Sequence, residues 1–317
     1  MSATLAPTSP DRALRPATHP WLRRILWLNL VVEVGIVVTG GLVRLTGSGL
    51  GCPTWPECVP GSYTPTVEQA EGFHKVIEFG NRTLTGLLGL VAVALVVALW
   101  RWARERRELL LGALGVLVGV AAQAVVGGIT VLTGLNPWIV AFHLLASMFL
   151  IAVSAWLVWR SGQPGGRLPL AVHPLVHRLS WAVVAMTAVV LVLGTIVTGS
   201  GPHSGDADEP ARTGFDPRTV SWLHADSVML FAGLVVAVWV GARLSGRSPA
   251  PARAWGVVAL VTLAQGGIGY VQYLTDLPEA LVLAHMLGAC LLVVAVTRAM
   301  VLQRQPVGAD AQTAVHG

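Results

Sequence analysis

Eight long apolar stretches dominate this chain of 317 residues. A membrane-spanning helix needs about 20 mostly apolar residues. Hydrophobic residues make up 54% of the chain and charged residues only 12%, which is too apolar for an ordinary soluble domain. The sequence therefore predicts an all-α membrane protein with eight transmembrane helices, at 25–46, 74–100, 109–133, 137–159, 179–199, 220–242, 254–275 and 279–301.

The basic residues predict how the helices are oriented. If the N-terminus is cytoplasmic, sixteen of the 21 Lys and Arg residues fall on the cytoplasmic side, and five fall outside: Arg44, Lys75, Arg82, Arg212 and Arg218. Cytoplasmic loops of membrane proteins carry such an excess. We therefore expect a multi-pass protein of the cell membrane with both termini cytoplasmic. The net charge of +5 does not indicate nucleic-acid binding, because the arginines lie in short loops.

The second half of the chain repeats the first. VAAQAVVGGITVLTGLNPWIVAFHLLASM (120–148) resembles VTLAQGGIGYVQYLTDLPEALVLAHMLGA (261–289), and IVVTGG (36–41) resembles IVTGSG (196–201). EFGNR then lies over SWLHA, which places Asn81 opposite His224. Repetition of this kind predicts two pseudo-symmetric four-helix bundles with the same orientation in the membrane. The expected boundaries are a disordered N-terminus at 1–20, a first half at 21–160, a cytoplasmic linker at 161–178, a second half at 179–302 and a disordered tail at 303–317.

Three histidines lie at similar depth in the predicted helices. His143, His224 and His285 lie four to six residues from the outer ends, or roughly 6–9 Å at 1.5 Å per residue. Two imidazoles from facing helices can ligate a haem iron from both sides. The alternative is that each ring hydrogen-bonds a neighbouring helix. We favour haem ligation, because the three share one depth and His143 and His285 occupy equivalent positions of the repeat.

The stretch HKVIEFGNR places several polar groups at the mouth of an apolar helix. His74, Glu78, Asn81 and Arg82 share one broad helix face, since residues three and four apart are neighbours there. One interpretation is a simple Glu78–Arg82 ion pair. The other is a carboxylate beside a buried prosthetic group, where it handles protons. Arg82, together with Arg44, is placed to pair with haem propionates.

Two cysteines lie close together in the first outer loop, GLGCPTWPECVPG. Cys52 and Cys58 are separated by five residues that include proline, which suits a disulfide in an oxidising compartment. Such a bridge is either a structural staple or a redox-active pair, and the sequence leaves both open.

These motifs together resemble the heme A synthase family. The resemblance rests on GGLVRLTGSGLGCPTWPEC (40–58), IEFGNR (77–82) and the duplicated plan of residues 20–302. It implies a bacterial oxidoreductase that converts a methyl group of heme O to the formyl group of heme A by successive hydroxylations. It also implies a haem b on His224 and His285, a substrate haem near His143 and Glu78, and a disulfide between Cys52 and Cys58. The implied partners are an electron donor, heme O synthase and assembly proteins of cytochrome c oxidase.

One departure from the family pattern concerns helix 74–100. Many members carry Glu-x-x-His-Arg there, whereas this chain has Asn81 before Arg82. An amide is a far poorer iron ligand than imidazole. Either His143 alone holds the substrate iron, or His74 supplies a second imidazole from two turns away.

The sequence also allows two functions other than an enzyme. A membrane cytochrome that only carries electrons would bind haem without altering it, and a transporter built from repeats would more often place charges near the midplane. The chemical inequality of the halves, with Glu78 and Asn81 opposite Ser221 and His224, favours the enzyme.

Overall fold

The computed structural model describes residues 15–66, 72–206, 210–245 and 248–306. These residues contain eight helices, each long and apolar enough to cross a membrane. They are α2 (Pro20–Leu45), α3 (His74–Ala103), α4 (Arg107–Leu132), α5 (Pro137–Ser161), α6 (Pro174–Ser200), α7 (Pro217–Leu244), α8 (Pro249–Leu274) and α9 (Glu279–Leu302). The predicted all-α membrane fold with eight spans is confirmed.

All eight described helices are longer than the apolar runs that predicted them, and α6, α7 and α8 start earlier than predicted, directly after a capping residue. Asn136, His173, Asp216 and Ser248 each precede a proline, and their side chains accept a hydrogen bond from a backbone N–H of the first turn. Such a side chain satisfies a donor that has no partner within the helix, and proline suits the first helical position. These helices therefore begin in the polar boundary layer.

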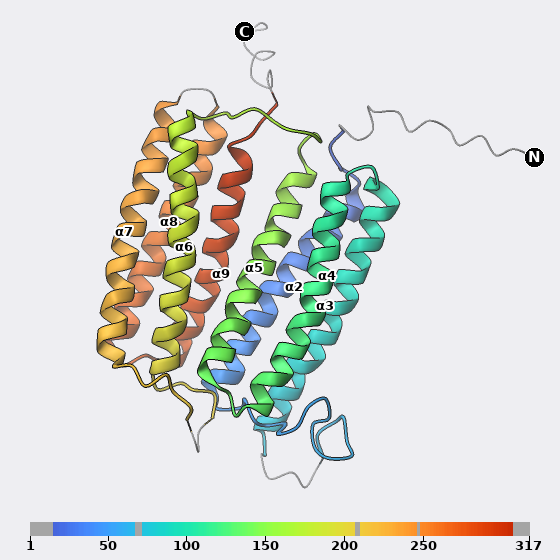
Figure 1. The fold of residues 1–317 in the computed structure, drawn as a ribbon, viewed down its shortest axis with the longest axis vertical. Coiled ribbons are helices and arrows are strands. Elements are labelled where there is room, and N and C mark those ends of the chain that lie inside the picture. Colours follow the sequence, from blue (N-terminus) through green and yellow to red (C-terminus); the bar gives the residue numbers. More distant parts are fainter. Residues whose placement is uncertain (1–14, 67–71, 207–209, 246–247, 307–317) are drawn as a thin grey trace, which may run out of the picture.

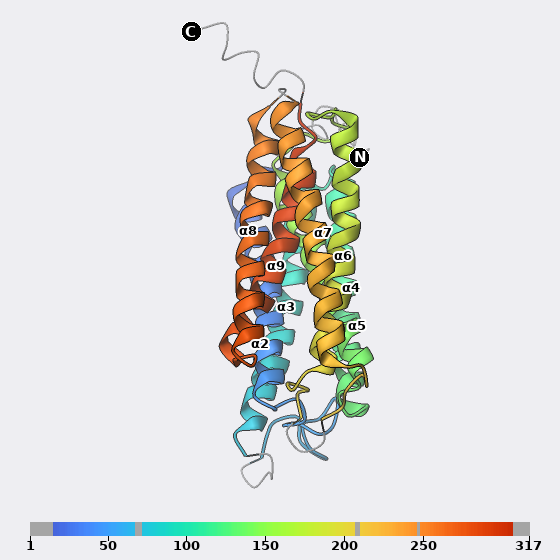
Figure 2. The ribbon, with the colours of Figure 1, turned by 90° about the vertical axis from the view of Figure 1, so that its left-hand side faces the viewer.

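The helices form two four-membered groups that lie side by side (Figure 1). Within the first group, α2 contacts α3 and α5, and α4 contacts α3 and α5, so the four helices close a ring. In the second group α6, α7, α8 and α9 contact one another in the same cyclic order. Figure 2 shows the second group turned toward the viewer, with α7 and α8 in front of α9. Each group encloses its own apolar core.

Four helices join the two groups: α2 and α5 of the first, and α6 and α9 of the second. Helix α9 contacts α2 and α5, and α5 also contacts α6. Buried apolar residues fill this junction, among them Val37, Ile151 and Val293. Large apolar side chains also cover the outer surface, where Leu90, Phe149 and Leu263 are each about 70% exposed. A soluble protein rarely shows so large an apolar surface, so this surface suits contact with lipid.

The backbone conformation of the turn that follows α4 is repeated in the turn that follows α8. Leu135 and Leu277 both have a φ near +57°, a conformation unusual for leucine. The N–H of Leu135 donates to the carbonyl of Thr130, and the N–H of Leu277 donates to the carbonyl of Gln272, each at 2.8 Å. The two turns therefore share one geometry. The pseudo-symmetry of the whole bundles remains a prediction.

The chain ends of the described region pack against the inner end of the bundle, where α2 begins and α9 ends. The N–H of Ala17 donates to the carbonyl of Ser161. The side chain of Gln303 is fully buried, donates to Ser180 Oγ and contacts His177 Nδ1. Ordered contacts thus extend into 15–20 and 303–306. The disorder predicted for 1–14 and 307–317 falls outside the described residues.

Candidate functional site

A disulfide closes the loop that covers the outer end of α3. Cys52 and Cys58 are bonded with an S–S distance of 2.05 Å, and both are fully buried. The predicted bridge is therefore present. Trp55, between the two cysteines, packs against the backbone of α4, where a Cβ atom at Gly128 would lie only 2.3 Å from the indole ring. Because residue 128 is glycine, the indole ring of Trp55 can lie directly against the helix backbone.

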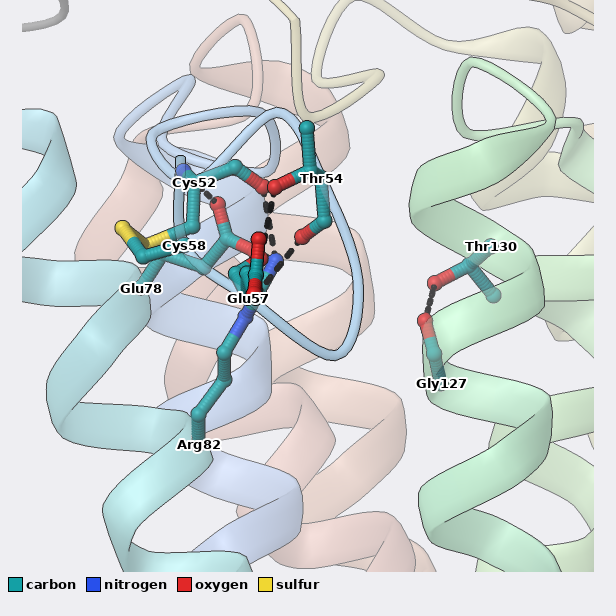
Figure 3. A network of polar contacts seen from close by, with 8 residues as sticks. All are labelled: Cys52, Thr54, Glu57, Cys58, Glu78, Arg82, Gly127 and Thr130. Atoms are coloured by element: carbon teal, nitrogen blue, oxygen red, sulfur yellow. Dashed lines mark hydrogen bonds and ion pairs between the residues drawn. A yellow bond between two sulfur atoms is a disulfide. The ribbon is translucent and has the colours of Figure 1, made fainter. Parts of the chain in front are cut away.

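Glu78 connects this loop to α3. Its Oε2 accepts a hydrogen bond of 2.7 Å from the backbone N–H of Cys52, and its Oε1 accepts from Arg82 Nη2 at 2.5 Å (Figure 3). The residue is only 5% exposed. A buried carboxylate needs such partners, because an unpaired charge away from water is costly. The predicted Glu78–Arg82 ion pair is present, and the side chains of both residues also form hydrogen bonds with the backbone of the loop.

Arg82 uses all of its donors within the same assembly. A guanidinium has five N–H groups, and Arg82 makes five hydrogen bonds: Nε and Nη2 to Glu78 Oε1, Nη2 to the carbonyl of Cys52, and Nη1 to the carbonyls of Thr54 and Glu57. Figure 3 shows the side chain rising from α3 into the loop. A haem propionate would have to displace one of these acceptors. The geometry gives Arg82 the role of loop anchor, and its predicted propionate contact stays a prediction.

Loss of the Arg82 guanidinium is expected to loosen the loop. Hydrogen bonds to charged groups contribute about 1.5–3 kcal/mol each, so Arg82→Gln should lower the free energy of unfolding by about 2 kcal/mol or more. Limited proteolysis of the loop and thermal unfolding measure this effect. Arg218→Gln is the matched control, because Arg218 lies at the start of α7, near the same end of the bundle, and its guanidinium covers the ring of Trp222. Equal protease resistance of the two variants would contradict the anchoring role.

His74 lies at the first residue of α3 and contacts the same loop. Its Nδ1 is 2.8 Å from Ser48 Oγ, and the residue is exposed. The backbone of His74 also lies close to Gly51, where a Cβ atom would approach it within 2.5 Å. Ser48 was not predicted from the sequence, because the repeat carries no signal for it. His74 thus stands at the loop, two turns above Asn81.

The three helix histidines share an unusual feature. The Nδ1 atoms of His143, His224 and His285 are all buried and have no hydrogen-bond partner among the described residues. The imidazoles of His224 and His285 lie close enough to interact electrostatically. The ring of His224 interacts with the backbone of Val190 in α6, so the alternative of hydrogen bonding to a neighbouring helix has support there, whereas the Nδ1 atoms of all three rings have no partner among the described residues. Buried polar atoms without partners call for an explanation, and a bound prosthetic group is one.

A glycine lies against each of these rings. A Cβ atom on Gly127 would lie 3.5 Å from the ring of His143, one on Gly194 would lie 3.4 Å from His224, and one on Gly269 would lie 3.6 Å from His285. Gly127 and Gly269 each follow an aligned glutamine by four residues, so the repeat contained this signal. The glycines leave room for the rings between helices. The set of buried imidazoles fits a haem iron as its ligands.

Asn81 does not take the place of an imidazole. Its Oδ1 accepts a hydrogen bond of 2.8 Å from Thr39 Oγ1, which ties α3 to α2. In the second half, Thr198 Oγ1 instead donates to the carbonyl of Gly194 within its own helix. A Cβ atom on Gly35, one turn below Thr39, would meet nothing within 4 Å. The first half thus differs from the second at this position.

Two further polar side chains, those of Glu33 and Arg44, join neighbouring parts of the fold. Glu33 is buried between α2 and α5, where its Oε1 accepts from Asn29 Nδ2 at 3.2 Å and from Ser154 Oγ at 3.0 Å. Arg44 reaches across to the second half and donates to the carbonyls of His203 and Thr198. Arg44 therefore joins the outer loops of the two halves, and its predicted propionate contact stays a prediction.

Comparison with known proteins identifies the family. Residues 23–297 match the family model COX15-CtaA, described as cytochrome oxidase assembly protein. A heme A synthase of Methylorubrum extorquens is 30% identical over 360 residues, which cover 95% of this chain and 91% of that protein. A heme A synthase of Bacillus cereus is 24% identical over 302 residues, covering 90% of this chain and 96% of the relative. With its eight spans and its disulfide-closed outer loop, the chain belongs to the COX15-CtaA family of cytochrome oxidase assembly proteins.

Proposed function

We propose that this protein is a heme A synthase, a membrane oxidoreductase that converts a methyl group of heme O to the formyl group of heme A. The observation that carries the proposal is the set of three buried imidazoles without Nδ1 partners, in a chain of this family. Relatives that cover most of the chain bear the name heme A synthase. That name favours the enzyme over an electron-carrying cytochrome or a transporter.

The second half is proposed to hold a resident haem b on His224 and His285. The two rings project from α7 and α9, and Gly194 and Gly269 leave room beside them. Two neutral imidazoles suit a six-coordinate haem, which supplies one-electron transfer when bound.

The first half is proposed to bind the substrate. His143 supplies one imidazole from α5, and Gly127 lies beside it on α4. Asn81 offers no second imidazole, and the contact of His74 with Ser48 places that ring at the loop. We therefore favour a substrate iron held by His143 alone. Weaker binding of this kind suits a molecule that must enter and leave.

Glu78 is proposed to act where the loop meets the substrate. It lies one turn from Asn81 on α3, and its carboxylate is fixed from two sides, by the N–H of Cys52 and by Arg82. A fixed negative group stabilises positive charge that develops on the reacting carbon without reorganising during the reaction. The disulfide loop above it shields the site from water.

The proposed setting is a bacterial cell membrane, with both termini in the cytoplasm. The bridge between Cys52 and Cys58 then faces the oxidising side, where disulfides persist. Heme O synthase would supply the substrate, an electron donor would serve the haem b, and cytochrome c oxidase assembly would consume the product.

The function is tested by expressing the chain in a bacterium that makes heme O but no heme A. The extracted haems are separated and their masses are measured by mass spectrometry. We expect heme A only in cells that carry the intact gene. Glu78→Ala should abolish heme A, whereas Glu57→Ala, in the loop that contacts Glu78, should retain it. Bound haem without any change in its mass would identify an electron carrier, and a colourless protein would exclude both haem-based functions.

A further inference from the structure

A groove lies between the inner ends of α7 and α8, far from the histidines. It encloses about 920 Å³ and is lined by Trp239 and Arg243 of α7 and by Arg253, Gly256, Val257 and Leu260 of α8. Both helices end or begin there on the side of the bundle where α9 ends (Figure 1). No residue of the proposed haem sites lines it.

The lining changes from charged to apolar along α8. Arg253 stands near the start of the helix, and Leu260 lies seven residues further, which is about 10 Å toward the membrane centre. Leu260 is 67% exposed and Val257 is 40% exposed, so both present apolar surface to the groove and its surroundings. One leaflet contributes about 15 Å of hydrocarbon. The groove therefore extends from the depth of the lipid headgroups to the depth of the acyl chains.

The two arginines of the groove have no acidic counterpart. Arg243 is held over the ring of Trp239 at 4.3 Å from its centroid, and this contact leaves its N–H edges unused. Neither Arg243 nor Arg253 makes an ion pair with any residue that the structure describes. Between Asp226 and Asp276 the sequence contains no Asp or Glu at all. The mouth of the groove is thus uniformly positive.

A smaller cavity at the equivalent hairpin of the first half differs in charge. It encloses about 490 Å³ and lies beside Arg104, which pairs with Glu105 at 3.6 Å. Arg106, also in its lining, pairs with Glu108 at 2.7 Å. Acidic residues therefore pair with two of the four arginines that line this cavity, whereas no acidic residue lines the α7–α8 groove.

We propose that the α7–α8 groove binds an anionic phospholipid of the inner leaflet. The phosphate and headgroup are recognised by Arg243 and Arg253, and one acyl chain lies along Trp239, Val257 and Leu260. Basic pockets between membrane helices recognise anionic headgroups in this way. A bound lipid would join the ends of α7 and α8, and α7 carries the proposed haem ligand His224.

The test measures lipid binding by the intact protein in native mass spectrometry, with phosphatidylglycerol and phosphatidylcholine of identical acyl chains as probes. The protein should retain phosphatidylglycerol in preference. The double variant Arg243→Gln/Arg253→Gln should bind it about 30-fold more weakly, since each basic residue near an anionic lipid contributes about fivefold. Gly256→Leu, which keeps both charges but fills the groove beside Trp239, should also lose the lipid.

The matched control is Arg178→Gln/Arg298→Gln, which removes the same charge from other helices at the same membrane side. It should bind phosphatidylglycerol like the unmodified protein. Equal loss in the control, unchanged binding in the groove variants, or release of the lipid by inorganic phosphate would each overturn the proposal. Thermal unfolding without added lipid confirms that the arginine variants remain folded.

Discussion

Replacement of His224 by alanine is expected to abolish the resident haem, with a loss of nearly all the haem b that co-purifies with the protein. His285→Ala should give the same result, because an iron held from two sides loses its six-coordinate state when either imidazole is removed. His143→Ala, in the first half, should leave this haem in place. The haem content per protein and the low-spin absorption spectrum report the outcome without any need for turnover.

The comparison works because the three rings share the same local setting. Each has a buried Nδ1 without a partner and a glycine beside it, so the variants remove equivalent side chains from equivalent surroundings. A general loss of stability would lower the haem content in all three. Loss in His224→Ala and His285→Ala alone assigns the haem b to the second half. Loss in His143→Ala alone would reverse the assignment of the halves.

The fold was predictable because apolar length and the repeat leave few alternatives. Eight runs of spanning length fixed the number of helices, and the alignment of Gln123 with Gln265 and of His143 with His285 fixed which positions correspond. The helix starts were less accurate. Capping by His173 or Asp216 extends a helix beyond its apolar run, which hydropathy alone does not register.

The site was predictable only where local spacing determines it. The i, i+4 spacing of Glu78 and Arg82 gave their ion pair, and the short separation of Cys52 and Cys58 gave the bridge. The contact between Glu78 and the N–H of Cys52 joins residues 26 apart through an irregular loop, and no periodicity encodes it. For the same reason the three hydrogen bonds of Arg82 to loop carbonyls changed the role that the sequence suggested for this residue.

Asn81→His is expected to convert the first half into a second tight haem site. The new imidazole would stand where His224 stands in the repeat, opposite His143. Gly40 of α2 faces Asn81, and a Cβ atom there would lie 4.0 Å from Asn81 Nδ2, so the backbone of α2 does not crowd this side chain. We expect the haem content to rise by about one equivalent per chain, in a low-spin state with two imidazoles.

Tighter binding should also slow release of the product. Because a site that holds substrate and product equally firmly does not accelerate the reaction, the variant should accumulate heme A on the protein while less reaches the cell. Thr39→Val is the matched control, since it breaks the hydrogen bond that holds Asn81 without adding a ligand. It should leave the low-spin signal at the level that the resident haem b gives in the unmodified protein. An unchanged haem content in Asn81→His, or an equal rise of the low-spin signal in Thr39→Val, would contradict a substrate iron held by His143 alone and would direct attention to His74 as the second ligand.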